Sequence, residues 1–183
     1  MGSSRPRTFR KCRSDCLTCP KLVKELTVKS QQTGRIYAAI NLDLHDIHCK
    51  LQNYIYVIQC SSCLVQYVGE SVIPVHKRMN IHRKGKTGCE IAIDHFKNVC
   101  PNSSFSVRIL ENLSGDGYKD GSVDLSLLNY RLEREDHWMK TLRTVYPYGL
   151  NERTKNMNKE KRILFCSCSD DLLFTVTYKF CGK

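Results

Sequence analysis

The stretch NYIYVIQCSSCLVQYVGESVIPVHKRMNIHR, residues 53–83, decides the fold of this chain. Two apolar runs rich in Val, Ile and Tyr flank the turn Cys60–Cys63, and this composition predicts a β-hairpin. We expect Gly69 to end the second strand in a tight turn and to leave Glu70 exposed. Pro74 suits the first turn of a helix that runs VHKRMNIHRK.

The predicted helix after Pro74 has one face that combines apolar and basic residues. Val75, Arg78, Met79 and His82 stand at positions i, i+3, i+4 and i+7 and therefore share that face. The two apolar residues belong against the sheet, which brings Arg78 and His82 to the edge of the buried surface beside the hairpin. Taken singly, a salt-bridged arginine and a histidine at the rim of the core are the plainer interpretations.

Three further elements follow the hairpin and its helix. CEIAIDHFKN predicts a short amphipathic helix, FSVRIL (105–110) alternates as a third strand, and residues 127–146 form the clearest helix of the chain. Glu135 lies on the apolar stripe of that last helix. A carboxylate on the core side requires a cation, and either a metal ion or a buried arginine would serve.

Eleven cysteines indicate metal binding, because an odd count without a secretory signal argues against a closed disulfide framework. Cys16 and Cys19 form a C-x2-C pair, and LHDIHCKL adds His48 and Cys49 downstream. Thiolates and imidazoles that total four make a tetrahedral zinc site. We therefore predict a structural zinc site at these four residues. The alternates are Cys12, His45, Cys60 and Cys63.

The charge of the chain favours a polyanionic partner. Lys+Arg 29 against Asp+Glu 18 gives a net charge of +11, which attracts nucleic acid and makes binding fall with salt. Near the N-terminus no apolar run resembles a signal peptide, and no run approaches 18 residues. We expect neither secretion nor membrane spanning, but an intracellular, reducing environment.

Five motifs in order resemble those of the GIY-YIG endonuclease domain. They are Tyr54-Ile-Tyr56, Tyr67-Val-Gly69, Arg78 with His82, Glu135 three residues before Trp138, and Gly149-Leu-Asn151. The strings YIYVIQC, QYVGES and HWMKTLRTVYPYGLNER are most similar to the version in Penelope-like retroelements, where a Cys/His zinc motif precedes the nuclease. The resemblance covers residues 12–153.

The resemblance implies an α+β fold, a small three-stranded antiparallel sheet flanked by helices, with an N-terminal zinc-binding extension. The expected organisation is a basic arm (1–11), a zinc-binding subdomain (12–52), the nuclease domain (53–153) and a basic run with a tail (154–183). The implied function is a divalent-metal-dependent DNA endonuclease that nicks duplex target DNA for retroelement integration. The alternatives are an inactive zinc-containing DNA-binding protein and a zinc-scaffolded module for RNA or protein.

The resemblance also implies roles for individual residues. Glu135 would hold Mg²⁺ or Mn²⁺, Tyr56 would take the proton of the attacking water once nearby cations lower its pKa, and Arg78 would stabilise the phosphate. Tyr67 and His82 would contact the phosphate or relay the proton, and Asn151 would position the backbone. Expected DNA contacts come from Arg83, Lys84, Lys86 and Arg153. Expected partners are DNA and a reverse transcriptase domain or retroelement RNA, for a nuclear monomer or transient dimer.

Overall fold

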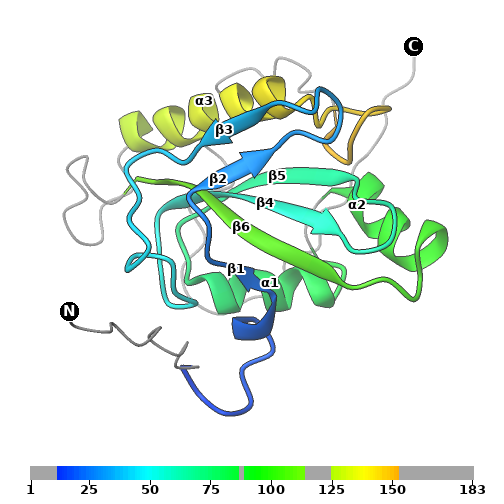
Figure 1. Cartoon of the computed structure of the whole chain (residues 1–183), viewed down its shortest axis with the longest axis horizontal. Coiled ribbons are helices and arrows are strands. Elements are labelled where there is room, and N and C mark those ends of the chain that lie inside the picture. Colours follow the sequence, from blue (N-terminus) through cyan, green and yellow to red (C-terminus); the bar gives the residue numbers. More distant parts are fainter. Residues whose placement is uncertain (1–11, 87–88, 114–124, 153–183) are drawn as a thin grey trace, which may run out of the picture.

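The computed structural model describes residues 12–86, 89–113 and 125–152 (Figure 1). Its main sheet has four strands in the order β1-β6-β4-β5, and β2 and β3 form a separate two-stranded sheet. The strands are β1 (Leu22–Val23), β2 (Thr27–Lys29), β3 (Ile36–Ala38), β4 (Tyr54–Cys60), β5 (Gln66–Ser71) and β6 (Phe105–Asn112). The helices are η1 (Cys19–Lys21), α1 (Val75–Arg83), α2 (Glu90–Asp94), the π-helical turn η2 (His95–Val99) and α3 (Leu125–Leu142). This mixed α+β architecture agrees with the predicted fold class.

The hairpin that the sequence predicts is the centre of the sheet. β4 pairs antiparallel with β5 on one side and with β6 on the other. Its seven residues are almost all buried, because both of its faces are covered. A central strand of this kind reads as a continuous apolar run, and YIYVIQC does so.

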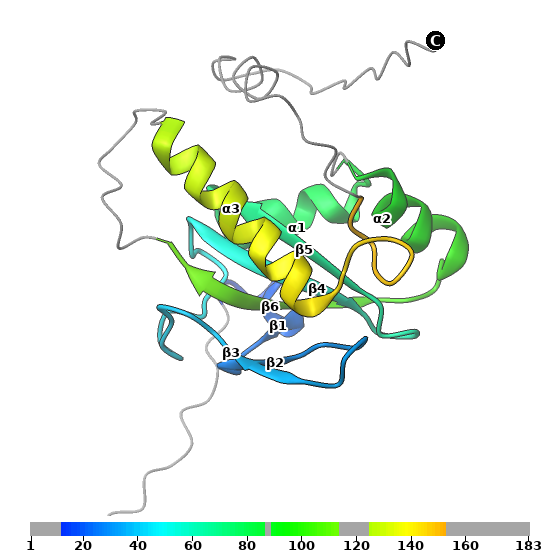
Figure 2. The same ribbon diagram turned by 90° about the horizontal axis from the view of Figure 1, so that it is seen from above.

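Two hydrophobic clusters fill the two faces of the sheet. In Figure 1, α1 lies below the sheet and α3 above it, and Figure 2 looks down on α3. Alternate residues of β4 point to opposite faces. Tyr56 therefore packs in the cluster that contains Val75 and Met79 of α1. Ile55 and Val57 pack against α3, in the cluster that also contains Trp138, Met139, Leu142 and Val28 of β2.

The N-terminal segment adds a fourth strand that the sequence did not reveal. β1 pairs in parallel with β6, with Leu22 opposite Val107. The predicted three antiparallel strands are present, but the complete sheet is mixed. The β2–β3 hairpin lies beside α3, and the hydroxyl of Ser30 donates a 2.8 Å hydrogen bond to the carbonyl of Leu142. Residues 12–52 thus pack directly on the rest of the described chain.

α3 is held by a buried carboxylate on the neighbouring strand. Glu111 of β6 is 1% exposed, and its two oxygens accept hydrogen bonds from Arg134 Nε, each 2.9 Å long. The indole of Trp138 donates to the same carboxylate at 2.9 Å. Because a buried carboxylate needs such donors, this cluster fixes how α3 lies on the sheet.

Three local predictions were wrong. α3 ends at Leu142, not at residue 146, because Arg143 adopts a left-handed conformation with φ 54°. Tyr146, the last residue of the predicted helix, is therefore outside it, and it is exposed. Gly69 does not end a strand, since β5 continues to Ser71. Glu70 is not in an exposed turn: it is half-buried in β5 and paired with Arg131 of α3 at 3.1 Å.

In the part of the chain that the structure describes, no helix is both long enough and apolar enough to span a membrane. Arg153, the basic arm and the tail lie outside the described residues.

Candidate functional site

The phenol of Tyr56 is the centre of a hydrogen-bond network between β4 and α1. Arg78 Nε donates to its oxygen at 2.9 Å, and His82 Nε2 lies 2.7 Å from the same oxygen. Arg78 and His82 are one helical turn apart and therefore reach the same point from one face of α1. The structure thus brings together three of the six residues predicted to be catalytic.

The electrostatics of this network define where its protons lie. Burial, reinforced by the positive charges of Arg78 and Arg83, lowers the pKa of His82 to about 3. Burial raises the pKa of Tyr56 to about 12, and the charge of Arg78 only partly opposes it. At neutral pH the phenol is therefore protonated and the imidazole is neutral. If the neutral imidazole carries its hydrogen on Nδ1, His82 Nε2 accepts the phenolic hydrogen, while Arg78 donates to the phenolic oxygen.

Tyr67 and Glu135 complete the group on the side of the edge strand β5. The ring centroids of Tyr67 and Tyr56 are 6.4 Å apart, and that of Tyr67 lies 5.5 Å from the His82 ring. Burial raises the pKa of Tyr67 well above its usual value. The negative charge of the half-buried Glu135, on α3, contributes to raising the pKa of both tyrosines.

Asn151 contacts the backbone of β5 with both ends of its amide. Its Oδ1 accepts from the backbone N–H of Val68 at 2.9 Å, and its Nδ2 donates to the carbonyl of the same residue at 2.7 Å. Val68 stands between Tyr67 and Gly69. The side chain of Asn151 therefore fixes the strand segment that carries Tyr67.

Three of the four basic residues predicted to contact DNA, Arg83, Lys84 and Lys86, lie at the C-terminal end of α1 or just after it. Arg83 is half-buried, with its guanidinium 5.8 Å from the centre of the Phe105 ring, and it donates to the hydroxyl of Thr18 at 3.0 Å. Lys84 and Lys86 are exposed just beyond it. This places positive charge next to His82.

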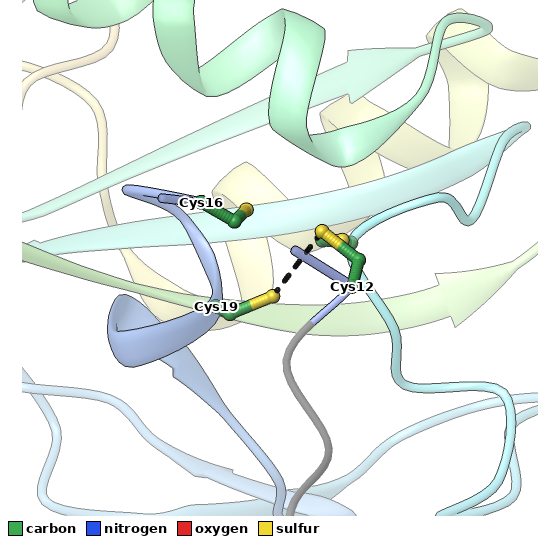
Figure 3. A group of neighbouring side chains, drawn as sticks. Cys12, Cys16 and Cys19 are labelled. Carbon is green, nitrogen blue, oxygen red and sulfur yellow. Dashed lines mark hydrogen bonds between the residues drawn. The ribbon is translucent and has the colours of Figure 1, made fainter. Parts of the chain in front are cut away.

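Four thiols converge at the N-terminal end of the described chain. The sulfurs of Cys12, Cys16, Cys19 and Cys49 all lie within 4.8 Å of one another, and Figure 3 shows the first three turned toward a common point. Cys12 and Cys19 are 3.7 Å apart, sulfur to sulfur. Sulfurs bound tetrahedrally to one zinc at about 2.3 Å lie roughly 3.8 Å apart. The four residues could therefore hold a metal ion such as zinc.

The composition of this cluster differs from the predicted ligand set in one residue. Cys16, Cys19 and Cys49 are in it, but the fourth position belongs to Cys12, which was an alternate. His48 is exposed and is not part of the group, and the same is true of His45. The turn Asp46–His48, closed by a 2.8 Å hydrogen bond between the backbones of these two residues, precedes Cys49, which is buried whereas His45 and His48 are exposed.

The pKa values of two thiols in this cluster are shifted in opposite directions. Burial opposes ionisation of Cys16, but hydrogen bonds from the backbone N–H groups of Cys19 and Thr18 lower its pKa to about 7. Burial and the neighbouring thiols of Cys12 and Cys19 raise the pKa of Cys49. Several thiolates at this spacing repel one another unless a cation lies between them, which is the chemistry of a metal site.

A second Cys/His group lies where the turn between β4 and β5 meets η2 and the residue after it. Cys60, Cys63, His95 and Cys100 have ligand atoms within 4.8 Å of one another, and Cys63 Sγ lies 3.5 Å from His95 Nε2. This group too could hold a metal ion such as zinc. Cys60 and Cys63, named above as alternate ligands of the first site, thus group with His95 and Cys100 and not with Cys49.

His95 and Cys100 were not predicted as metal ligands, although the sequence carries a signal for them. The chain carries C-x2-C in the β4–β5 turn and H-x4-C at the end of η2, which is ordinary spacing for zinc ligands. That pairing was available from the sequence. It requires only that the hairpin turn and the end of η2 meet, as the 2.8 Å hydrogen bond from the N–H of Ser61 to the carbonyl of Ser104 shows.

The low pKa of His82 predicts a pH-dependent stability. The folded pKa of about 3 lies below the unfolded value, so the stabilisation is complete above about pH 6.5 and is lost as pH falls toward 3. The unfolding free energy of the parent protein should fall between pH 7 and pH 5.5. We expect this fall to be smaller in the variant His82→Gln. The slope for one group is at most roughly 1.4 kcal/mol per pH unit. Urea unfolding at both pH values measures it.

The exposed His45 supplies the control for this measurement. His45→Gln should leave the pH dependence of the unfolding free energy as it is in the parent protein. An unchanged pH dependence in His82→Gln would contradict the assigned protonation state.

In comparisons with known proteins, no family model, no curated protein and no solved structure matches the chain.

Proposed function

We propose that this protein is a divalent-metal-dependent DNA endonuclease that hydrolyses phosphodiesters. The observation that supports it best is the Tyr56 phenol held between Arg78 Nε and His82 Nε2, with Glu135 and Tyr67 beside it. A cation for the phosphate, a proton acceptor and a carboxylate for a metal ion are the groups that such hydrolysis requires. The resemblance of the sequence motifs to GIY-YIG endonucleases points to the same reaction.

The network suggests how protons move in this reaction. Arg78 stabilises the charge of the scissile phosphate. Tyr56 takes the proton of the attacking water while it gives its own to His82, which is neutral and adjacent. This pair of proton transfers takes the place of the predicted mechanism, in which nearby cations lower the pKa of Tyr56. Burial instead raises that pKa to about 12.

Glu135 is the residue that would hold Mg²⁺ or Mn²⁺. Among the described residues, no group of three or more Asp, Glu, His or Cys surrounds the tyrosines, so one carboxylate would share the ion with water and phosphate oxygens. Magnesium is commonly bound in this way. When bound, the ion supplies Lewis-acid stabilisation of the phosphate and of the leaving oxygen.

The charge and the cysteines support two further parts of the proposal. The net charge of +11 and the basic end of α1 provide the attraction for DNA. Both Cys/His groups are proposed to bind zinc with a structural role, because each offers four protein ligands and leaves no open position. Nicking for retroelement integration in the nucleus, together with a reverse transcriptase domain, remains the proposed context.

Cleavage of supercoiled plasmid tests the proposal. With Mg²⁺ or Mn²⁺ the parent protein should give nicked circles, and Glu135→Ala should reduce the nicking rate by at least about a hundredfold, since one catalytic group typically contributes that much. Glu133→Ala is the matched control, because Glu133 is exposed on the same helix. Equal cutting by the parent protein and Glu135→Ala would refute the site.

A second candidate function is DNA binding without cleavage. The pKa values of about 12 for Tyr56 and about 3 for His82 favour it, because a protonated phenol is no base and an imidazole with so low a pKa accepts its proton only weakly. Salt-dependent DNA binding without nicking under any divalent metal would support this alternative.

A further inference from the structure

A pocket with a volume of about 290 Å³ lies directly beside the proposed catalytic network. One of its lining residues is His82, which also hydrogen-bonds to the phenol of Tyr56 at 2.7 Å. The volume is at the lower end of ligand pockets, roughly 300–1,000 Å³. The pocket therefore suits a group of the size of one base better than a longer ligand.

The walls of the pocket are apolar and aromatic. They are formed by Ile58 of β4, Phe105 of β6, and Ala92, Ile93 and Phe96 of α2 and η2. The rings of Phe96 and Phe105 pack edge to face at 5.8 Å. Aromatic and apolar side chains of this kind are the surfaces on which unstacked nucleobases pack.

The rim of the pocket is basic. Arg83, Lys84 and Lys97 line it, and the last two are exposed. The guanidinium of Arg83 stays fixed over the Phe105 ring through its hydrogen bond to Thr18. Cations around an apolar hollow match a nucleotide, whose phosphates remain outside while its base enters.

The wall formed by α2 and η2 is anchored independently of DNA. His95 of η2 belongs to the second Cys/His group, and its ring packs against that of Phe96 at 5.0 Å. The same group includes Cys60 and Cys63 at the end of β4 and in the turn that follows. The pocket is therefore formed before any ligand arrives.

We infer that this pocket binds one unpaired nucleobase of the DNA strand next to the phosphate to be cut. The inference rests on the proposed endonuclease function and deepens it, since it names DNA with an unpaired nucleotide as the preferred substrate. A base that is already unpaired enters the pocket without the free energy of breaking a base pair, and this is a source of selectivity.

The test measures binding separately from cutting. In a Glu135→Ala background, we expect a duplex with one unpaired 2-aminopurine to bind about tenfold more tightly than the fully paired duplex. Its fluorescence should change on binding as the base leaves its stacked position. Ile93→Trp fills the pocket and should abolish both effects while affinity for the paired duplex stays the same. Val99→Trp is the control, because Val99 is 64% exposed and does not line the pocket.

A charge variant tests the rim in the same way. Lys97→Gln should weaken binding of the unpaired substrate more than Lys77→Gln, which removes an exposed lysine of α1 outside the pocket. Equal affinity for paired and unpaired duplexes, or a preference that survives Ile93→Trp, overturns the inference. If the parent protein still nicks plasmid in that case, the proposed function stands. If it neither binds nor nicks DNA, both fail.

Discussion

Replacing Cys49 with serine is expected to lower the zinc content from two ions per chain to one and to unfold much of the domain. The parent protein is expected to bind two zinc ions because it has two groups of four ligands that could each hold one. Structural zinc contributes about 10–16 kcal/mol of binding free energy in zinc-finger peptides, while whole domains are stable by only about 5–15 kcal/mol. Loss of one site can therefore exceed the stability of the fold. Metal analysis and thermal unfolding of the purified variant measure the two effects.

The contacts of Cys49 explain why this effect should reach the proposed catalytic residues. Its carbonyl accepts hydrogen bonds from both the backbone N–H and Nδ1 of His76, each 2.9 Å long, in the first turn of α1. Thr18, next to Cys19, accepts from Arg83 in the last turn. Cys49 and the neighbour of Cys19 thus contact the two ends of the helix that carries Arg78 and His82.

Cys89 provides a matched control for this prediction. It is also buried, but it belongs to neither Cys/His group, and its thiol donates to the carbonyl of Leu150 at 3.1 Å. A serine can donate the same hydrogen bond, so Cys89→Ser should keep both zinc ions. Equal metal content and equal melting temperature in the two variants would show that the N-terminal cluster binds no structural metal.

The sequence predicted well those elements whose signal is local. The hairpin β4–β5 and the helix α1 follow from apolar patterns within residues 53–83, and the structure confirms both. The β2–β3 hairpin also has a local signal in the sequence, the glycine at position 34, whose φ is +70°. In each case neighbouring residues determine the element, so no knowledge of the tertiary structure is needed.

The failures concern contacts between residues far apart in the chain. The parallel pair of Leu22 with Val107 joins segments 85 positions apart, and a two-residue strand has no periodicity to detect it. The choice of Cys12 over His48 is of the same kind, since the spacing permits either ligand. Only the packing of Cys49 beside α1 decides which of them lies within reach.

The second large effect is expected at Gly69. This residue stands opposite Tyr56 in the β4–β5 pair, and a Cβ added to it would lie 2.5 Å from the phenolic oxygen and 2.6 Å from Cζ. Real side chains do not approach so closely. Glycine is therefore required here by the Tyr56 ring that covers it, and not by the turn that the sequence suggested.

Gly69→Ala should consequently displace the Tyr56 ring, which is fully buried and cannot move without disturbing Arg78 and His82. We expect nicking to fall by at least about a hundredfold, because the proton acceptor and the phosphate-binding cation lose their geometry together. We also expect destabilisation of roughly 1–3 kcal/mol from overpacking. These effects are separated by measuring plasmid nicking, urea unfolding and metal content on one preparation. We expect the variant to retain both zinc ions.

Gly34→Ala is the control for the loss of a glycine as such. Its added Cβ meets no atom within 4 Å, although φ of +70° makes the substitution strained. We expect this variant to lose about 1 kcal/mol of unfolding free energy and to nick at the parent rate. Parent-like nicking by Gly69→Ala would mean that the Tyr56 phenol is not needed where the structure places it, and the proposed proton transfer to His82 would then be wrong.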